Sequence, residues 1–318
     1  MIEARETFEC FGSQCVVIVS GEDSRSGASA ERAALLAREQ LLAWHDQFSR
    51  FIASSELSRL NANTEWTVAV SPMMGRLLAA VAAAGALTNG LVDATQTGEL
   101  ERAGYRHSLQ GGVPLPMALD LAPARRPAKA AAWPRWAELM VDTAAGTVIR
   151  PPGVRVDSGG LAKGLFADEL AARLGRHSAF VVGCGGDLAL GGEAGVRRAV
   201  NVESPFDGST LQTFAYARGA VATSGIGRRS WLDENGAPAH HLLDPSTGRP
   251  AYTGIVQATA LAPTALLAEA RAKAALLAGP RKAEQWLPDG GVVVYDDGAH
   301  DVFGPTVRGA DERIPARV

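Results

Sequence analysis

Short runs of apolar, β-branched residues recur along this sequence, and helical patterns interrupt them at irregular intervals. Strand-type runs lie at 16–19, 255–261 and 291–295, while leucines and phenylalanines repeat at helical spacing over 31–48 and 161–174. Regular alternation of strands and helices predicts a doubly wound parallel sheet, whereas irregular interspersion favours α+β. We therefore expect an α+β fold with mixed or antiparallel sheets flanked by helices.

Local signals extend this prediction. Ser71 and Pro72 are typical of a helix start and predict a helix over 72–87. A further helix is expected over 264–278, and 8–20 reads as a strand. Glu234, Asn235 and Gly236 form a hairpin-type turn signal, and 103–135, rich in proline, arginine and glycine, is expected to be a long loop. The three cysteines have no disulfide-type or zinc-type spacing and are expected to be buried thiols.

Composition excludes several classes of partner. The net charge is −3 and the sequence pI is about 6.1, so no strongly basic face is implied and nucleic acid is not expected as a partner. The longest apolar run near the N-terminus is 16–19. It is shorter than the apolar stretch of ~7–15 residues that a signal peptide contains and than the ~20 apolar residues of a membrane span. The sequence as given thus predicts a cytoplasmic protein without a membrane partner.

Two glycine-rich segments follow apolar strands. In 156–164, VDSGGLAKG, a strand enters a helix, and exposed N–H groups at a helix start favour a pyrophosphate. A tight structural turn is the alternative. In 183–187, GCGGD, neither a G-x-G-x-x-G pattern nor a suitably spaced acidic residue supports a dinucleotide fold. This segment is either a ligand loop or the turn at the end of a strand.

Two later segments carry hydroxyl, basic and imidazole groups. The loop 221–225, VATSG, precedes Arg228 and Arg229 and is consistent with a phosphate site or with a solvated surface loop. His241, next to His240 and ahead of an Asp-Pro-Ser-Thr-Gly turn, is the best candidate for a general base because imidazole titrates near neutrality. A structural role for this histidine is the alternative.

The order of these segments is more informative than any one of them. It runs VDSGGLAKG at 156–164, VGCGGDL at 182–188, VATSG at 221–225 and HHLLDPSTGRP at 240–250. In this order and spacing the chain resembles the FAD:protein FMN transferase (ApbE-type flavin transferase) family. Upstream segments that resemble the family are FGS at 11–13, SRF at 49–51, SELSRLN at 55–61 and LVDAT at 91–95. The similarity extends from about residue 8 to residue 295.

The resemblance implies a function and a site. Family members bind FAD, cleave its pyrophosphate and attach FMN to a threonine of a partner flavoprotein, or hydrolyse FAD to FMN and AMP. The resemblance implies one domain over 1–318, or two subdomains around an FAD cleft, and makes His241 the base. The residues it implies at the FAD are Phe11, Phe51, Asn61, Leu91, Val92, Asp93, Asp157, Gly159, Gly160, Leu165, Thr223, Ser224, Val256 and Lys273.

The family's metal site differs in this sequence. Members use a backbone carbonyl, here that of Ala162, with an Asp and a Thr that correspond to Glu269 and Lys273. A protonated lysine cannot coordinate Mg²⁺, and Glu at i with Lys at i+4 is a favourable helix pair. One expectation is Mg²⁺ at Ala162 and Glu269; the other is that Lys273 lies near the phosphates and supplies charge. The retained His241 favours a transferase or FAD pyrophosphatase, whereas the changed ligands favour an FAD-binding protein without Mg²⁺-dependent activity.

Overall fold

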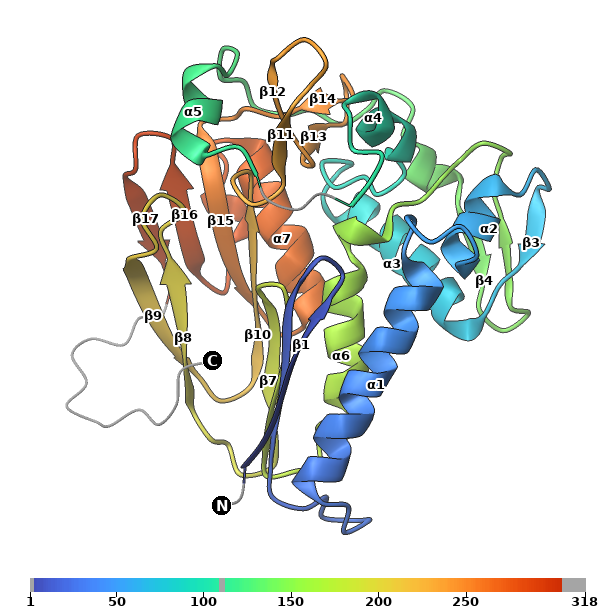
Figure 1. The fold of residues 1–318 in the computed structure, drawn as a ribbon, viewed down its shortest axis with the longest axis vertical. Coiled ribbons are helices and arrows are strands. Elements are labelled where there is room, and N and C mark those ends of the chain that lie inside the picture. The colour runs from blue at the N-terminus through green and yellow to red at the C-terminus, as the bar shows by residue number, and fades with distance from the viewer. Residues whose placement is uncertain (1–2, 109–111, 305–318) are drawn as a thin grey trace.

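The computed structural model describes residues 3–108 and 112–304 and forms an α+β fold, as the sequence predicts (Figure 1). The helices are α1 (Ala30–Phe48), α2 (Glu56–Ala62), α3 (Pro72–Leu87), α4 (Thr97–Arg102), α5 (Leu115–Asp120), α6 (Ala162–Leu174) and α7 (Ala265–Ala278). Short 3-10 turns are η1 (Arg135–Glu138), η2 (Ser158–Gly160) and η3 (Glu284–Trp286).

An eight-stranded sheet forms the body of the molecule, and each neighbouring pair of strands in it is antiparallel. Its order is β1 (Glu3–Cys10), β2 (Ser13–Ser20), β6 (Ala179–Cys184), β7 (Asp187–Gly191), β10 (Gly219–Gly225), β15 (Ile255–Ala262), β16 (Gly291–Tyr295) and β17 (His300–Phe303).

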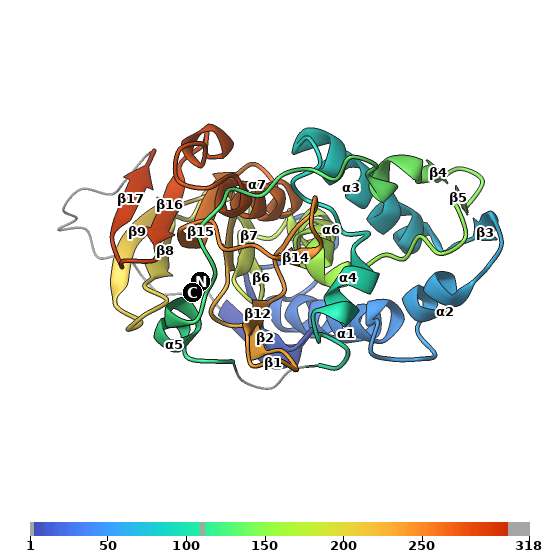
Figure 2. The same cartoon turned by 90° about the horizontal axis from the view of Figure 1, so that it is seen from above.

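Four smaller antiparallel sheets surround it. They are β3 (Thr67–Ala69) with β5 (Thr147–Ile149) and β4 (Met140–Asp142), β8 (Arg198–Glu203) with β9 (Thr210–Tyr216), β11 (Ser230–Leu232) with β12 (Pro238–His240), and β13 (Leu243–Asp244) with β14 (Arg249–Pro250). The β3–β5–β4 sheet lies at the opposite end of the molecule from β17 (Figures 1 and 2).

The central strands are buried on both faces. Because side chains alternate along a strand, Val17 and Phe180 enter one hydrophobic cluster with α1 and α6, while Ile18 and Val181 enter a second cluster with the β8–β9 hairpin. This two-sided burial explains the continuous apolar run of β6, whose residues are all buried.

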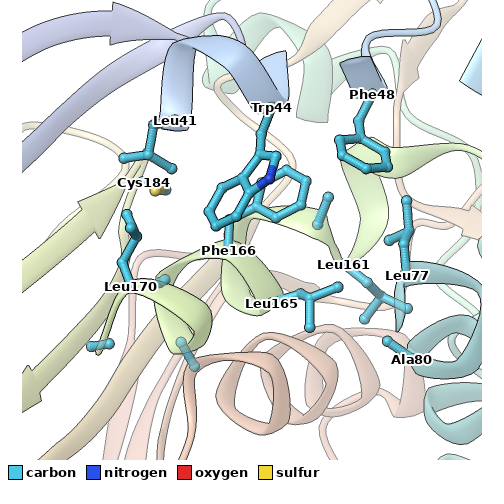
Figure 3. Packing of buried hydrophobic residues seen from close by; sticks show 14 of the residues in the cluster. Leu41, Trp44, Phe48, Leu77, Ala80, Leu161, Leu165, Phe166, Leu170 and Cys184 are labelled. Atoms are coloured by element: carbon cyan, nitrogen blue, oxygen red, sulfur yellow. The ribbon is translucent and has the colours of Figure 1, made fainter. Parts of the chain in front are cut away.

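Helix α6 lies between α1 and α7 on one face of the large sheet (Figure 2). Its Phe166 is fully buried, and its ring stacks on Trp44 with a centroid distance of 4.8 Å and lies 5.3 Å from the ring of Phe48 (Figure 3). This packing fixes the start of α6, the segment that carries the glycine motif, against the end of α1.

The structure confirms the four predicted helices to within one residue at each end. It also confirms the hairpin turn at 234–236, between β11 and β12. The single strand expected over 8–20 is wrong, because Phe11 and Gly12 form a tight turn between β1 and β2. The predicted long loop 103–135 contains α5, and its residues 109–111 lie outside the described residues.

The cysteine expectation is confirmed: Cys10, Cys15 and Cys184 are free, buried thiols. Among the helices of the described ranges, none combines the length and the apolar character needed to cross a bilayer.

The close approach of α6 and α7 depends on a glycine, which gives a test of the fold. A Cβ on Gly164 would lie 2.7 Å from the carbonyl oxygen of Ala265 and 2.8 Å from Cα of Leu266. These are backbone atoms, so the two helices must separate. We expect Gly164→Ala to lower the free energy of unfolding by about 1–3 kcal/mol.

Gly75 is the matched control, because it is also a helical glycine but its Cβ would meet its nearest neighbour, a Thr143 methyl, at 3.8 Å. Gly75→Ala should be neutral or stabilising by up to ~1 kcal/mol. Urea unfolding followed by circular dichroism measures both. Equal stability of Gly164→Ala and wild type would show that the two helices do not need this contact.

Candidate functional site

A cavity of about 240 Å³ lies where the start of α6 meets the C-terminal end of α1 and the middle of α7. Further parts of its wall come from the β1–β2 turn, residues 49–52, residues 91–96, Leu100, Tyr105, Ser108, residues 157–160, Arg229 and residues 241–243. Chain segments far apart in sequence, from Phe11 to Leu277, therefore converge on one site.

The β1–β2 turn brings Phe11 into this wall. Phe11 and Gly12 both have positive φ, 54° and 63°, in a two-residue connection between paired Cys10 and Ser13. Positive φ at both central residues is the pattern of a type I′ hairpin turn, and it is unusual for a bulky residue. The Phe11 ring packs 5.4 Å from that of Phe166, a contact that offsets the backbone strain.

The turn that precedes α6 forms a second part of the wall. The Asp157 carboxylate accepts the Gly159 N–H at 3.0 Å and lies 3.5 Å from the Arg50 Nε. The Ser158 hydroxyl donates to the Phe48 carbonyl at 2.7 Å. These contacts hold Gly159 and Gly160 at the cavity, next to the positive end of the α6 dipole, where an anionic group is stabilised.

Two lysines and two carboxylates form a buried cluster beside this turn. Lys163 Nζ pairs with Asp187 Oδ2 and lies 3.6 Å from Glu269 Oε1, which accepts from Lys273 Nζ at 2.8 Å. The backbone N–H of Gly164 donates to the other Glu269 oxygen at 2.9 Å. Both lysines line the cavity, whereas the two carboxylates lie behind them.

The pKa values follow from this arrangement. Burial raises the pKa of Asp187 to about 6, although Lys163 opposes the shift. Burial also acts to raise the pKa of Glu269, but Lys273 and Lys163 outweigh it and lower that pKa below its ordinary value. Burial disfavours charge on Lys163, yet its two carboxylate partners raise its pKa, so it stays protonated at neutral pH.

The donor set does not fit a resident Mg²⁺. Both oxygens of Glu269 are engaged, one by Lys273 and one by the Gly164 N–H, and an ammonium repels a divalent cation. Within 3–108 and 112–304, no group of three or more His, Cys, Asp or Glu side chains has the arrangement of a metal site. Ala162 does line the cavity, but Glu269 does not.

His241 lines the cavity together with Lys163 and Lys273. Its Nδ1 lies 3.4 Å from the Arg229 carbonyl, so a proton on Nδ1 leaves Nε2 as the free acceptor. Burial, with the positive charges of Arg229 and Lys273, lowers the pKa of His241 well below 6.5. The imidazole is therefore neutral at pH 7 and able to accept a proton.

His240 has a different environment. It is 1% exposed, its ring stands edge-on to Tyr252 at 4.8 Å, and burial lowers its pKa to about 3. It is not among the residues that line the cavity. Its position is that of a core histidine.

Aromatic side chains border the mouth of the cavity. The Arg50 guanidinium lies 4.2 Å from the centre of the Phe51 ring and 4.6 Å from that of Tyr105, which stacks on Trp231. Phe51 remains 38% exposed, so its outer face is open to a planar ligand.

The segment 91–93 forms another part of the wall. Asp93 accepts the Thr95 N–H at 2.8 Å, and burial raises the pKa of its carboxyl. The cavity therefore includes most of the residues that the resemblance implies at the FAD: Phe11, Phe51, Leu91, Val92, Asp93, Asp157, Gly159, Gly160 and Lys273.

Five of the expected FAD residues lie elsewhere. The Asn61 amide donates to the Val156 carbonyl and accepts the Val156 N–H, both at 2.8 Å, so it braces the segment before the glycine turn. Leu165 belongs to α6 and packs its side chain into the hydrophobic core (Figure 3). Thr223 bonds to Thr259 at 2.8 Å within the large sheet. Ser224 and Val256 are buried in adjacent strands of the same sheet, and none of the five lines the cavity.

Other wall residues were missed as ligand contacts. Lys163 lies inside the glycine motif, so its charge beside a phosphate-type turn was an available signal. Arg229 belongs to the basic pair noted in the sequence, and its partner Arg228 is exposed and does not line the cavity. Arg50 and Tyr105 gave no signal, because only the fold brings them together.

Comparison with known proteins gives a consistent answer. The family model described as "ApbE family" matches residues 11–295. A Rhodobacter capsulatus protein named FAD:protein FMN transferase is 30% identical over 312 residues, which cover 93% of this chain and 56% of that protein. An Escherichia coli protein of the same name is 32% identical over 151 residues, which cover 45% of this chain and 42% of that protein. The chain thus spans less than half of the length of the E. coli relative.

Solved structures agree on the fold. The ApbE protein of Thermotoga maritima superimposes with a TM-score of 0.75 at 24% identity, and the match covers 95% of this chain and 97% of that one. The match of the family model over nearly the whole described chain, together with this shared fold, shows that the chain belongs to the ApbE family.

Proposed function

We propose that this protein binds FAD in the cavity, cleaves its diphosphate and passes FMN to a threonine hydroxyl of a partner flavoprotein or to water. One observation carries the proposal: His241, the glycine turn before α6 and two lysines line the same cavity. Curated relatives bear the name FAD:protein FMN transferase, which supports the same reaction.

The arrangement is suited to phosphoryl transfer. The attacking hydroxyl gives its proton to His241 Nε2 as its oxygen bonds to the FMN phosphorus. The bond between that phosphorus and the bridging oxygen breaks, and AMP leaves with the bonding electrons. The products are FMN on the threonine, or free FMN when water attacks, together with AMP. Such catalysis consists mostly of positioning and stabilisation of charge.

Each wall of the cavity has a part in this proposal. Gly159 and Gly160 lie beside the diphosphate at the positive end of α6. Phe11 and Phe51 offer aromatic surfaces to the flavin or adenine rings. The Arg229 carbonyl positions the His241 ring through Nδ1.

A second function is FAD binding without Mg²⁺-dependent transfer. The observation that favours it is the engagement of both Glu269 oxygens by the Lys273 ammonium and the Gly164 N–H. The names of the relatives favour the transferase.

One experiment separates the two functions. We expect purified protein incubated with FAD to release AMP, with FMN appearing free or, when a partner flavoprotein is added, on that protein. Chromatography of nucleotides and in-gel flavin fluorescence measure these products. FAD recovered intact but bound would select the second function. Absence of FAD binding by calorimetry would remove both.

The two neighbouring histidines give a matched pair of variants. We expect His241→Ala to lower the rate of AMP release by ~10²–10⁴-fold, the usual contribution of a general base. His240→Phe, which keeps an aromatic ring against Tyr252, should retain most of the activity. If the His240 variant lost activity and the His241 variant kept it, the assignment of the base to His241 would be wrong.

The pH dependence tests the state of His241. The base must be neutral, so activity falls as the pH drops through its pKa. Because burial and nearby positive charges lower the pKa of His241 well below 6.5 in the free protein, the acidic limb of kcat/KM, which reports the free protein, should lie below pH 6.5. Arg229→Gln removes one of these charges and should move the limb upward. NMR titration of the imidazole is an independent measurement, and a wild-type midpoint at or above 6.5 would contradict this account.

A further inference from the structure

We propose that this protein holds the diphosphate of its ligand with a cationic cluster of its own, Lys163, Lys273 and Arg229, in place of a divalent metal ion. The proposal rests on the proposed function, because it takes FAD as the ligand. It assigns to three side chains the charge neutralisation that a metal ion otherwise supplies.

Three separate elements bring these cations to one wall of the cavity. Lys163 lies in the first turn of α6, Lys273 in the middle of α7, and Arg229 between β10 and β11. Arg229 and Lys273 line the cavity with His241, and the positive charge of each acts on that histidine; the charge of Arg229 also acts on Lys163.

Glu269 aligns the two ammonium groups. It is 0% exposed, and its Oε1 lies 2.8 Å from Lys273 Nζ and 3.6 Å from Lys163 Nζ. An ammonium has three N–H donors, so Lys273 keeps two after its bond to Glu269. Glu269 therefore positions both ammonium groups at the cavity wall.

Arg229 is also held in place, and among residues 3–108 and 112–304 it has no acidic partner in an ion pair. Its Nη2 donates to the Phe11 carbonyl at 3.0 Å and lies 3.4 Å from the Ser13 hydroxyl. Neutral oxygens position the guanidinium without cancelling its charge, so the charge remains available to an anion.

The charge balance favours an anion over a cation. Lys163, Lys273 and Arg229 carry three positive charges, and Asp187 and Glu269 carry two negative ones, which leaves +1 before the ligand binds. A divalent cation would raise this to +3 in a buried site, whereas a diphosphate with two negative charges brings it to −1. Mg²⁺ also needs about six oxygens at ~2.0–2.1 Å, and both oxygens of Glu269 already accept a hydrogen bond.

The first experiment is titration calorimetry with FAD in buffer containing EDTA and again in buffer containing MgCl₂. We expect the two dissociation constants to agree within roughly threefold, because the protein supplies the cation. Binding only in the presence of Mg²⁺ would overturn the inference and leave the proposed function intact. Failure to bind FAD in both buffers would instead remove the proposed function.

The second experiment changes the cluster. Lys273→Met keeps an unbranched side chain up to the ε position but removes the ammonium group, and in EDTA we expect FAD to bind roughly 10- to 100-fold more weakly. The double variant Glu269→Asp with Lys273→Thr removes the ammonium and provides a free carboxylate and a hydroxyl, so its FAD binding should come to depend on Mg²⁺. Lys282→Met, an exposed lysine that does not line the cavity, is the control and should bind FAD as wild type does.

Thermal unfolding of each variant shows whether a weaker affinity reflects a lost contact or a damaged fold. If Lys273→Met folds as wild type does and binds FAD equally well in EDTA, the inference is wrong. If that variant fails to fold, the comparison of EDTA with MgCl₂ on the wild-type protein decides the question.

Discussion

The bond between the Glu269 carboxylate and the first turn of α6 is the contact on which the site depends. A buried carboxylate is costly unless charges and hydrogen bonds satisfy it. Glu269 meets this requirement with the Gly164 N–H and two lysines, and it can reach that N–H only because Gly164 lets α7 approach closely. The glycine motif thus sets the spacing of the helices as well as the shape of the turn.

Much of the fold could be predicted from local sequence. Helical periodicity and caps located α1, α3, α6 and α7, because amphipathic spacing records which side of a helix is buried. The β1–β2 hairpin was not predicted, because Phe11 has a left-handed backbone conformation that is unusual for phenylalanine. The order of the strands in the sheet could not be predicted from local sequence either, because β2 pairs with β6 across about 160 residues of chain.

The residues of the candidate site were likewise predicted only in part from the sequence. Contiguous motifs led to Gly159, Gly160 and His241, all of which line the cavity. Asn61 belongs to a quoted motif, yet its amide is bound to the backbone of Val156, a role that sequence similarity cannot separate from ligand binding. Arg50 reaches the site through contacts with Tyr105 and Asp157, more than 50 residues away, which no local pattern records.

The cations around the cavity link binding to the state of the base. The positive charges of Arg229 and Lys273, which we propose bind the diphosphate, also lower the pKa of His241. A protonated imidazole would add a further positive charge to a cluster that already carries an excess, so the proton is disfavoured. Binding of an anionic ligand reduces that excess and makes the imidazole more basic when the hydroxyl proton has to be accepted. In the proposed reaction, the cations would therefore keep His241 unprotonated in the free protein, and the bound anion would restore part of its basicity in the complex.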